Sequence, residues 1–494
     1  MGAQPIALCA EILLFHDIST ARGSRHLVKP IVVRSAIVAA TGGLLFGFDT
    51  AVISGAEEQI QQVFALSDAK LGFTVTTALI GTILGALVTG RPADRYGRKK
   101  ALYVIGVLFV LGAVGSALAP NVEILMLFRF IGGIGVGGAS VCAPIYTAEI
   151  APAANRGRLV GLVQFNIVLG ILIAYASNAV IRAAVPGDNA WRWMLGVMIV
   201  PALVFVLMLP TVPETPRWLA ANGRWDDATA TSKRLCATQA DVDFQMREIR
   251  ESLAATANMT KVPFFTRGHR KVILLAVAIA VFNQLSGINA VLYYAPRVMQ
   301  EAGASTNAAF LMSVGVGAMN LVATMVGLSL IDRLGRRKLM IVGSIGYLMS
   351  LGFLAAVMFY YENARGGEFT STSSILVLIG LMGFIAAHAV GQGSVIWVFL
   401  SEIFPNRIRG QGQSLGSLTH WVFAAITSFA FPPIIGALGA GAAFSIFFLA
   451  MVGQLIWVLK VMPETKGVPL EEMQAKLGVA LDHGPDQPTA VRAH

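Results

Sequence analysis

The stretch of sequence that constrains the architecture most is Asp94-Arg95-Tyr96-Gly97-Arg98-Lys99, a charged motif between two long apolar runs. It returns 238 residues later as Asp332-Arg333-Leu334-Gly335-Arg336-Arg337. Two further motifs repeat in the same order. Glu149-Ile150-Ala151-Pro152 returns as Glu402-Ile403-Phe404-Pro405 after 253 residues, and Pro213-Glu214-Thr215 returns as Pro463-Glu464-Thr465 after 250. Three repeated motifs at similar offsets indicate an internal repeat, with two halves of the same structure.

The composition is that of a membrane protein. Of 494 residues only 13 % are charged and 55 % are apolar, whereas soluble domains carry about 25 % charged residues. A transmembrane helix needs about 20 mostly apolar residues, and twelve such runs can be read from the sequence. They lie near 31–54, 71–90, 101–119, 123–146, 159–181, 192–211, 271–295, 308–331, 339–360, 375–400, 411–437 and 441–462. The sequence therefore predicts an all-α membrane protein of two six-helix bundles, a parallel repeat suited to alternating access around a central site.

The positive charges indicate how the chain is oriented. Cytoplasmic loops of membrane proteins are enriched in Lys and Arg, and one set of loops here holds 28 of the 37 while the opposite set holds five. We therefore expect both termini in the cytoplasm, and we interpret the net charge of +10 as an orientation signal rather than a nucleic-acid-binding face. The predicted divisions are a tail (1–30), a first bundle (31–212), a helical cytoplasmic linker (213–270), a second bundle (271–464) and a tail (465–494).

Two charged side chains, Asp49 and Arg129, are predicted to be the only formal charges well inside the helices. A charge at a helix centre costs about 2.5–3.5 kcal/mol on the insertion scale, so a functional role is the first expectation. Each residue is predicted to lie about six residues, or about 9 Å, below the outer surface. At matching depth the two can pair, and the alternative interpretation is a static ion pair that only fixes helix packing.

Enzyme chemistry is not indicated. The three cysteines lie far apart without metal-ligand spacing, and no nucleophile, base and orienting group occur together, so we predict no metal and no cofactor. The glycine-rich stretch 132–138 follows no strand and has no P-loop lysine, so it is interpreted as close helix packing.

Several motifs resemble those of one transporter family. The segment 90–99 resembles the loop signature of the major facilitator superfamily. Four further segments resemble its sugar porter family: Pro213-Glu214-Thr215-Pro216-Arg217-Trp218-Leu219, Gln284-Leu285-Ser286-Gly287-Ile288-Asn289, Tyr293-Tyr294-Ala295-Pro296 and Pro463-Glu464-Thr465-Lys466-Gly467. The resemblance covers about residues 31–467. It implies the major facilitator fold and sugar transport. It also implies protonation of Asp49, because facilitative members tend to carry a neutral residue there.

The resemblance also implies a substrate site made of amides and aromatic rings, which suit sugar hydroxyls and C–H faces. Its predicted members are Gln164, Asn283, Gln284, Asn289, Asn320, Trp397 and Trp421. Two histidines within the apolar helices, His388 and His420, stand where relatives carry an aromatic residue and an amide. They are predicted either to contact sugar or to be neutral imidazoles bonded to backbone, and His420 also to modulate coupling by titrating.

Two gates complete the prediction. Tyr293 and Tyr294 are expected to form the outer gate, where helix seven can bend at Gly287 and Pro296. Charge pairs at the cytoplasmic rim are expected to hold the halves together while the outer side is open. Their members would be Arg98, Glu149, Arg156, Arg336, Glu402 and Arg409. Lys and Arg that only set topology are the alternative, which leaves the paired Glu residues unexplained.

The sequence thus predicts a proton-coupled importer of a monosaccharide, expected to be a hexose, in the plasma membrane or a bacterial inner membrane. Its partners would be the sugar, a proton and the lipid bilayer, and it would work as a monomer. The principal alternative is a facilitative uniporter in which the Asp49–Arg129 pair is structural. A polyol carrier, a sugar sensor and an exporter of drugs or organic anions are further alternatives.

Overall fold

The computed structural model describes residues 29–151, 156–257, 263–405, 407–468 and 470–477. In these segments, twelve helices are long and apolar enough to cross a membrane, as predicted, and no strand occurs. The first half contains α2 (Pro30–Val63), α3 (Asp68–Val88), α4 (Gly90–Tyr96), α5 (Arg98–Ala117), α6 (Val122–Ile150), α7 (Arg156–Ala184), α8 (Ala190–Gly196) and α9 (Ile199–Met208). The second contains α13 (Arg270–Leu285), α14 (Ile288–Glu301), α15 (Thr306–Leu334), α16 (Arg336–Phe359), α17 (Ser371–His388), α18 (Ser394–Ile403), α19 (Arg409–Leu438) and α20 (Ala440–Lys460).

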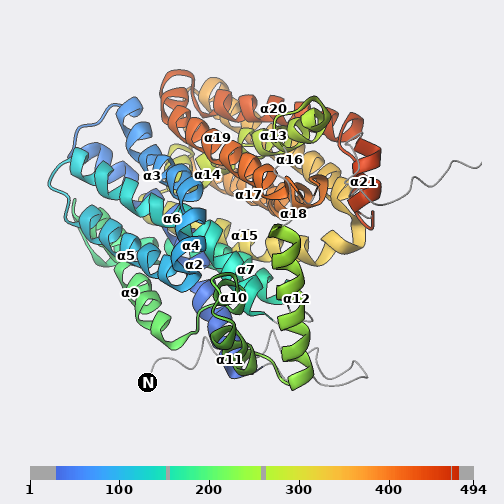
Figure 1. The fold of residues 1–494 in the computed structure, drawn as a ribbon. Coiled ribbons are helices and arrows are strands. Elements are labelled where there is room, and N and C mark those ends of the chain that lie inside the picture. Colours follow the sequence, from blue (N-terminus) through green and yellow to red (C-terminus); the bar gives the residue numbers. More distant parts are fainter. Residues whose placement is uncertain (1–28, 152–155, 258–262, 406, 469, 478–494) are drawn as a thin grey trace, which may run out of the picture.

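The linker between the halves is helical, as expected, and consists of α10 (Pro216–Ala221), α11 (Trp225–Leu235) and α12 (Gln239–Ala257). These helices lie beyond one end of the bundle (Figure 1), which we call the linker end. The opposite end, with the connections 64–67 and 302–305, is called the distal end. A short helix, α21 (Leu470–Leu477), follows α20.

The two halves pack against each other through three helix pairs. These pairs are α2 with α14, α3 with α19, and α7 with α15. In the second pair, α3 and α19 lie very close together at Gly72. A Cβ atom at this position would clash with the carbonyl oxygen of Phe429. Small residues permit such close contacts between membrane helices, and the glycine stretch on α6 does the same. A Cβ at Gly133 would clash with the Ala78 carbonyl of α3, which confirms the packing interpretation.

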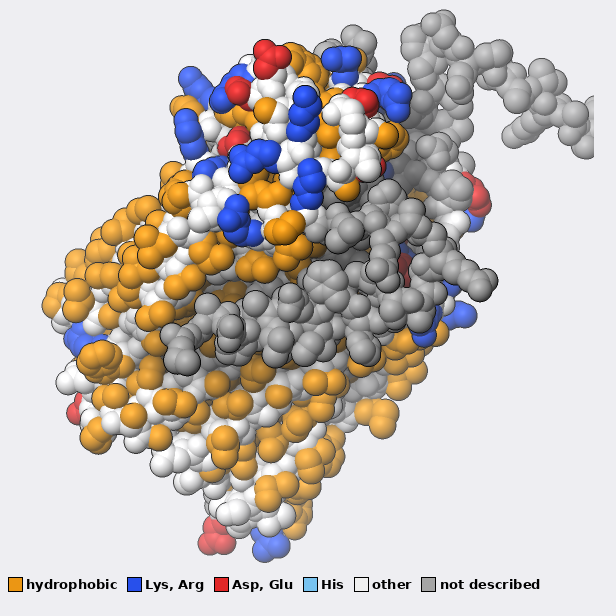
Figure 2. All heavy atoms as spheres, turned by 90° about the horizontal axis from the view of Figure 1, so that it is seen from below, with side chains coloured by type: hydrophobic (Ala, Val, Ile, Leu, Met, Phe, Trp, Pro, Cys, Tyr) orange, Lys and Arg blue, Asp and Glu red, His pale blue; other side chains and the backbone are white. Residues whose placement is uncertain are grey.

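The flank of the molecule is apolar. Figure 2 shows hydrophobic side chains over the flank, between one end rich in charged side chains and a tip with few. Large hydrophobic side chains more than half exposed include those of Val104, Leu207, Leu311, Met349 and Leu449. An exposed apolar flank of this extent is what a lipid environment requires of a multi-helix bundle.

Two spans of the second half are interrupted. The first breaks between α13 and α14 at Gly287, whose φ of +86° is in the left-handed region that glycine adopts without strain. Tyr294 is also non-helical, just before Pro296, so the predicted bends at Gly287 and Pro296 are confirmed. The second interruption is a π-helical turn, η6 (Ala389–Gly393), between α17 and α18. Predicted substrate-site residues flank both interruptions: Gln284 and Asn289 flank the first, and His388 and Trp397 flank the second.

The first helix is longer than predicted. It ends at Val63 rather than near residue 54, so Glu57 lies inside it with only 1 % of its surface exposed. The prediction that Asp49 and Arg129 are the only formal charges well inside the helices is therefore wrong. Asp49 lies 14 residues, or about 21 Å, from the end of α2, and not about six residues from it as predicted. The predicted helix was too short because the apolar run ends at residue 54, whereas the observed helix continues through Glu57, whose burial a partner from α14 makes tolerable.

Candidate substrate and coupling site

A cavity of about 130 Å³ lies between the two halves near the interrupted helices. Most of the predicted substrate-site residues line it: Gln164, Asn283, Gln284, Asn289, Asn320, His388, His420 and Trp421. Phe46, Thr50 and Thr324 also line it and were not predicted. Among the residues that the structure describes, the lining includes no Asp, Glu, Lys or Arg. A cavity with amides, hydroxyls and aromatic rings but no formal charge suits a neutral, hydroxyl-rich ligand.

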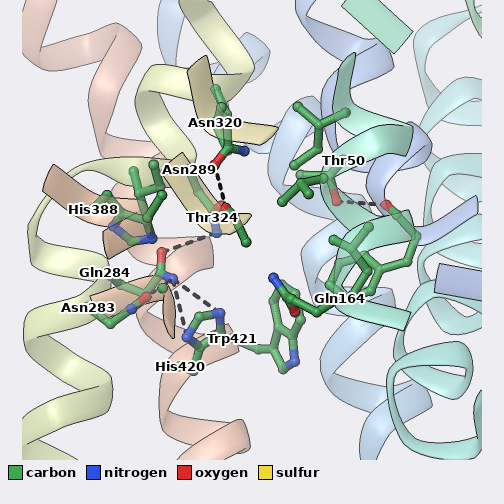
Figure 3. A pocket seen from close by; sticks show the side chains of 18 residues that line it. Thr50, Gln164, Asn283, Gln284, Asn289, Asn320, Thr324, His388, His420 and Trp421 are labelled. Atoms are coloured by element: carbon green, nitrogen blue, oxygen red, sulfur yellow. Dashed lines mark hydrogen bonds between the residues drawn. The ribbon is translucent and has the colours of Figure 1, made fainter. Parts of the chain in front are cut away.

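Gln284 is the centre of the polar lining on the second half (Figure 3). Its Nε2 donates to Asn283 Oδ1 at 2.9 Å, and its Oε1 accepts from Asn289 Nδ2 at 3.1 Å. The same Nε2 lies 3.2 Å from His420 Nε2. The break at Gly287 makes this arrangement possible, because it turns the start of α14 so that Asn289 faces the end of α13. His420 is thereby tied to an amide of the cavity, and not to backbone.

The first half supplies the opposite wall. Gln164 and Thr50 extend toward the cavity from α7 and α2 (Figure 3). Trp421 of α19 packs against Phe46 of α2, with ring centroids 5.6 Å apart, so an aromatic surface spans the two halves. A ligand in the cavity would therefore contact both halves at once.

His388 and Asn320 form a third part of the lining. The Tyr347 hydroxyl of α16 lies 2.6 Å from His388 Nδ1 and holds the imidazole from behind. Asn320 Oδ1 accepts from Thr324 one turn later on α15 at 3.4 Å. Of the two predicted alternatives for His388, the structure supports a side chain at the cavity, and its hydrogen-bond partner is a tyrosine rather than backbone.

Trp397 departs from the prediction. Its ring does not line the cavity but packs against His420, with centroids 5.2 Å apart, and 41 % of the residue is exposed. The π-helical turn that precedes α18 rotates the residues that follow, an effect that the sequence spacing does not reveal. In this conformation Trp397 therefore supports His420 and is not part of the lining.

The predicted pair between Asp49 and Arg129 is present. Arg129 Nη1 lies 2.7 Å from Asp49 Oδ1, and the two side chains are only 6 % and 7 % exposed. Asp49 precedes Thr50 of the cavity lining in α2, so the pair adjoins the cavity without facing it. Removing one partner of a buried pair leaves an uncompensated charge, which is strongly destabilising. Protonation of the carboxylate would remove the attraction between the two charges, and the Arg129 guanidinium would then be the one charge that still has to be solvated when the pair separates.

At the linker end, the repeated motifs form two equivalent networks. Arg98 bonds Glu149 at 3.1 Å, and Arg336 bonds Glu402 at 2.7 Å. Each carboxylate also accepts from a threonine hydroxyl of the repeated Pro-Glu-Thr motif at 2.6 Å. Each pair joins helices of one half, so in this conformation neither bridges the halves. The expected role between the halves remains a prediction.

The two remaining members of the predicted cytoplasmic gate, Arg156 and Arg409, take no part in these two networks as the structure describes them. The side chain of Arg156 lies outside the described residues. Arg409 is partly buried, and its Nε has no hydrogen-bond partner among the described residues. Glu214 is held by the backbone N–H of Lys99 at the start of α5, at 3.1 Å. Burial raises the pKa of the Glu214 carboxyl above its ordinary value of 4.5, and the backbone donors partly oppose this effect.

At the distal end, an ion cluster that sequence reasoning missed joins the halves. Arg297 of α14 lies 3.5 Å from Glu57 of α2, 3.6 Å from Asp68 of α3 and 3.2 Å from Glu301 of its own helix. It also donates to Gln61 Oε1 at 3.0 Å. We call these residues the distal cluster. The only available signal was the presence of one arginine on α14 and several acidic residues after Asp49.

The predicted gate tyrosines are buried below this cluster. Tyr293 and Tyr294 are 4 % and 0 % exposed, and the Tyr294 hydroxyl donates to the Ser428 carbonyl of α19 at 3.3 Å. From the first half, the Tyr175 hydroxyl donates to the Leu292 carbonyl at 2.6 Å. Helix α14 is thus held against both halves, and the distal end is closed in this structure.

Comparison with known proteins identifies the family. The family model described as "Sugar (and other) transporter" matches residues 35–477, nearly all of the chain. The chain belongs to the sugar porter family. It is 37 % identical to the D-xylose-proton symporter of Escherichia coli K12 over 482 residues, covering 89 % of this chain and 94 % of that protein. It is 34 % identical to the arabinose-proton symporter of Bacillus subtilis, covering 90 % and 94 %.

Solved structures of this sugar porter's relatives agree with the fold. The inward-open conformation of the xylose transporter XylE from E. coli superposes with a TM-score of 0.78 at 34 % identity, covering 90 % of this chain and 99 % of that one. The XylE complex with 6-bromo-6-deoxy-D-glucose gives 0.72 at 35 % identity, with the same coverage. The predicted family and the major facilitator fold are confirmed. These relatives are membrane transporters rather than enzymes, so the chain is a multi-pass membrane transporter.

Proposed function

We propose that this sugar porter imports a pentose, D-xylose first among the candidates, together with a proton by alternating access. The observation that carries the proposal is the uncharged, amide-rich cavity between the halves, with the buried Asp49–Arg129 pair of α2 and α6 beside it. The relatives named for a sugar transport xylose or arabinose. A pentose therefore takes the place of the expected hexose as the first substrate to test.

The proposed coupling follows from the charge balance of the pair. With Asp49 ionised, separation from Arg129 would leave two unpaired charges in a nearly dry interior, at a high cost. Protonation neutralises the carboxyl and removes the attraction that holds the pair together, so α2 and α6 can move relative to each other once water or other acceptors solvate the Arg129 guanidinium. Because Phe46 and Thr50 of α2 line the cavity, the movement of α2 also alters the substrate wall. Proton uptake and substrate capture are thereby linked through one helix.

The proposed orientation places the linker end in the cytoplasm, in agreement with the distribution of Lys and Arg. The distal end then faces outward, and its closure by α14 corresponds to a carrier whose outer gate is shut. The likeness to the inward-open form of XylE supports this assignment. In the outward-open form, Arg297 would have to leave Glu57 and Asp68, and the linker-end networks would approach each other.

Transport by the purified full-length chain in liposomes tests the proposal. We expect D-xylose to accumulate above its external concentration when the lumen is made alkaline, and to equilibrate only when no pH gradient is present. D-glucose and L-arabinose serve as parallel substrates. Accumulation of none of the three under a pH gradient would contradict proton-coupled import of these sugars. Preference for D-glucose would restore the hexose assignment.

A facilitative uniporter is the second candidate. The observation that favours it is the short distance of 2.7 Å between the buried Asp49 and Arg129 side chains, since a purely structural role also requires a short buried pair. It predicts equal D-xylose equilibration with and without the pH gradient and no uptake of protons with the sugar. A pH indicator inside the same liposomes separates the two candidates.

A further inference from the structure

The three cavity amides on α13 and α14 belong to a longer buried chain of hydrogen bonds. Asn283 Nδ2 donates to Gln392 Oε1 at 3.4 Å, and Gln392 Nε2 donates to Gln454 Oε1 at 2.9 Å. Gln454 Nε2 then donates to Ser344 Oγ at 2.8 Å. Gln392, Gln454 and Ser344 are fully buried and do not line the cavity. The chain runs from the cavity through η6 and α20 to α16, behind the substrate wall.

The last link fixes the direction of the whole chain. The Ser344 hydroxyl donates to the backbone carbonyl of Met340 at 2.7 Å. A carbonyl oxygen can only accept, and a hydroxyl has one proton to give. The Ser344 oxygen must therefore accept from its other neighbour, so the NH₂ end of Gln454 faces it. The carbonyl end of Gln454 then faces Gln392.

The same reasoning passes along each amide. A side-chain amide has donors at one end and an acceptor at the other, so fixing one end fixes the opposite end. The orientation of Gln454 sets that of Gln392, and Gln392 sets Asn283. Within the cavity lining, Asn283 Oδ1 accepts from Gln284, and Gln284 Oε1 accepts from Asn289. Reversing Gln454, Gln392, Asn283 or Gln284 would place two donors or two acceptors in contact at both ends of that amide, and reversing Asn289 would bring its Oδ1 against Gln284 Oε1.

The end of the chain is at the cavity. Asn289 donates inward to Gln284, so its own Oδ1 is directed away from the chain and makes no hydrogen bond to any described residue. Since Asn289 lines the cavity and is 8 % exposed, this oxygen is available as an acceptor for a ligand. Hydrogen-bond chains of this kind also strengthen one another in a low dielectric, so the polarity is a property of the whole chain.

We propose that Ser344, Gln454 and Gln392 are positioning residues that fix the hydrogen-bond polarity of the substrate site, so that Asn289 presents an acceptor to a donating hydroxyl of the sugar. The inference rests on the proposed function, because it needs a hydroxyl-bearing ligand in the cavity. It adds residues outside the cavity that act through Asn283, Gln284 and Asn289. It also predicts that one sugar hydroxyl acts as a hydrogen-bond donor to the protein.

Fluorinated sugars test this polarity. Fluorine cannot donate a hydrogen bond but can accept a weak one, so a fluoro analogue loses most where the protein presents an acceptor. The full-length chain in detergent would be titrated with D-xylose and with its 2-, 3- and 4-deoxy and deoxyfluoro analogues, by calorimetry. In the wild type, we expect one position at which the fluoro analogue binds no better than the deoxy analogue.

The test variant is Ser344→Ala, which removes the anchor of the chain. Its matched control is Ser350→Ala on the same helix, because the Ser350 hydroxyl donates only to α16 carbonyls, those of Gly346 and Tyr347. In Ser344→Ala, the amides lose their preferred direction. We expect D-xylose to bind about threefold more weakly, the size of an average hydrogen bond within a membrane protein. The ratio of the Kd of the fluoro analogue to the Kd of the deoxy analogue, which we call the analogue ratio, should also change at that position.

Gln454→Met, which keeps the side-chain length but interrupts the chain, should change the same analogue ratio as Ser344→Ala. Ser344→Thr, which retains a hydroxyl, should restore the wild-type ratio. Wild-type ratios in both folded Ser344→Ala and folded Gln454→Met would overturn the inference alone. A change of equal size in Ser350→Ala would overturn it as well, because it would reveal a general packing effect. Failure of the wild type to bind D-xylose, L-arabinose and D-glucose would instead overturn the proposed function.

Discussion

Arg297 of the second half lies 3.5 Å from the buried carboxylate of Glu57 in the first half, and this contact closes the distal end of the transporter. Asp68 and Gln61 contact the same guanidinium from the first half. One side chain of α14 therefore holds both α2 and α3. Any conformation open at the distal end must break this cluster. The strength of the cluster therefore helps to set the equilibrium between the distally closed and the distally open conformation.

Replacing Arg297 by Gln should shift that balance toward the distally open form. Glu57 is buried, so loss of its partner removes at least about 1 kcal/mol from the closed state, or at least about a fivefold change in the equilibrium. A chain with Cys9, Cys142 and Cys236 changed to Ser and with Thr50→Cys in the cavity reports the shift. Labelling by a membrane-impermeant thiol reagent from the distal side should become at least about fivefold faster.

The control for this experiment is Arg192→Gln. Arg192 also lies near the distal end, but it donates to the carbonyls of Ala117 and Ala119 within the first half. Its replacement should leave the labelling rate unchanged. Equal labelling of Arg297→Gln and the parent chain would show that the cluster does not hold the gate.

Asp49→Asn should abolish accumulation of D-xylose under a pH gradient while exchange of internal and external sugar continues. The amide has the size of the carboxyl but takes up no proton, and it no longer requires a charged partner. Accumulation and counterflow in liposomes give the two readings. Asp227→Asn, in the exposed linker pair with Arg224, should behave as the wild type. Full accumulation by Asp49→Asn would assign coupling to another group.

Tyr347→Phe should weaken sugar binding without touching the cavity itself. The hydroxyl that it removes is the partner of His388 Nδ1, so the imidazole loses its fixed orientation. We expect about a threefold increase in the Kd for D-xylose. Tyr361→Phe is a suitable control, because that ring stacks on Phe369 and neither residue lines the cavity. A matching change in both variants would argue against the role of the Tyr347–His388 contact.

Glu214 should make the stability of the linker end depend on pH. Burial raises the pKa of its carboxyl above 4.5 in the folded chain, so the folded state holds this proton more tightly than the unfolded state does. The corresponding stabilisation is complete below pH 4.5 and is lost as the pH rises through the raised pKa. Glu214→Gln should therefore flatten the fall in Tm above pH 4.5. A slope unchanged from that of the wild type would exclude Glu214 as its source.

The sequence was most informative where a signal is local. Twelve apolar runs gave the spans, because bilayer thickness sets helix length independently of tertiary contacts. Most cavity amides were also predictable, since Gln164, Gln284 and Asn289 are polar residues in apolar helices. Asp49 and Arg129 were correctly paired, although the position of Asp49 along its helix was wrong.

The remaining features depend on contacts between distant segments. The extension of α2 past residue 54 was missed, because the burial of Glu57 depends on Arg297, which lies 240 residues later. Trp397 was placed in the cavity, because a π-helical turn leaves no clear mark in residue spacing. Gln392 was not among the predicted site residues, since its role depends on Gln454 at the other end of the second half. A buried polar residue can be read correctly only with its partner.

The length of α2 has a mechanical consequence. Phe46, Asp49, Thr50 and Glu57 occupy one continuous helix within about 17 Å, and a Cβ at Gly47 would clash with the Ile167 carbonyl of α7. The helix is therefore one continuous segment packed tightly along α7, and a tilt at one of its ends also moves the other end. Phe46 and Thr50 of the cavity wall and Asp49 of the ion pair therefore move together whenever α2 tilts as a unit. The proposed protonation site and the sugar site are two points on one rigid segment.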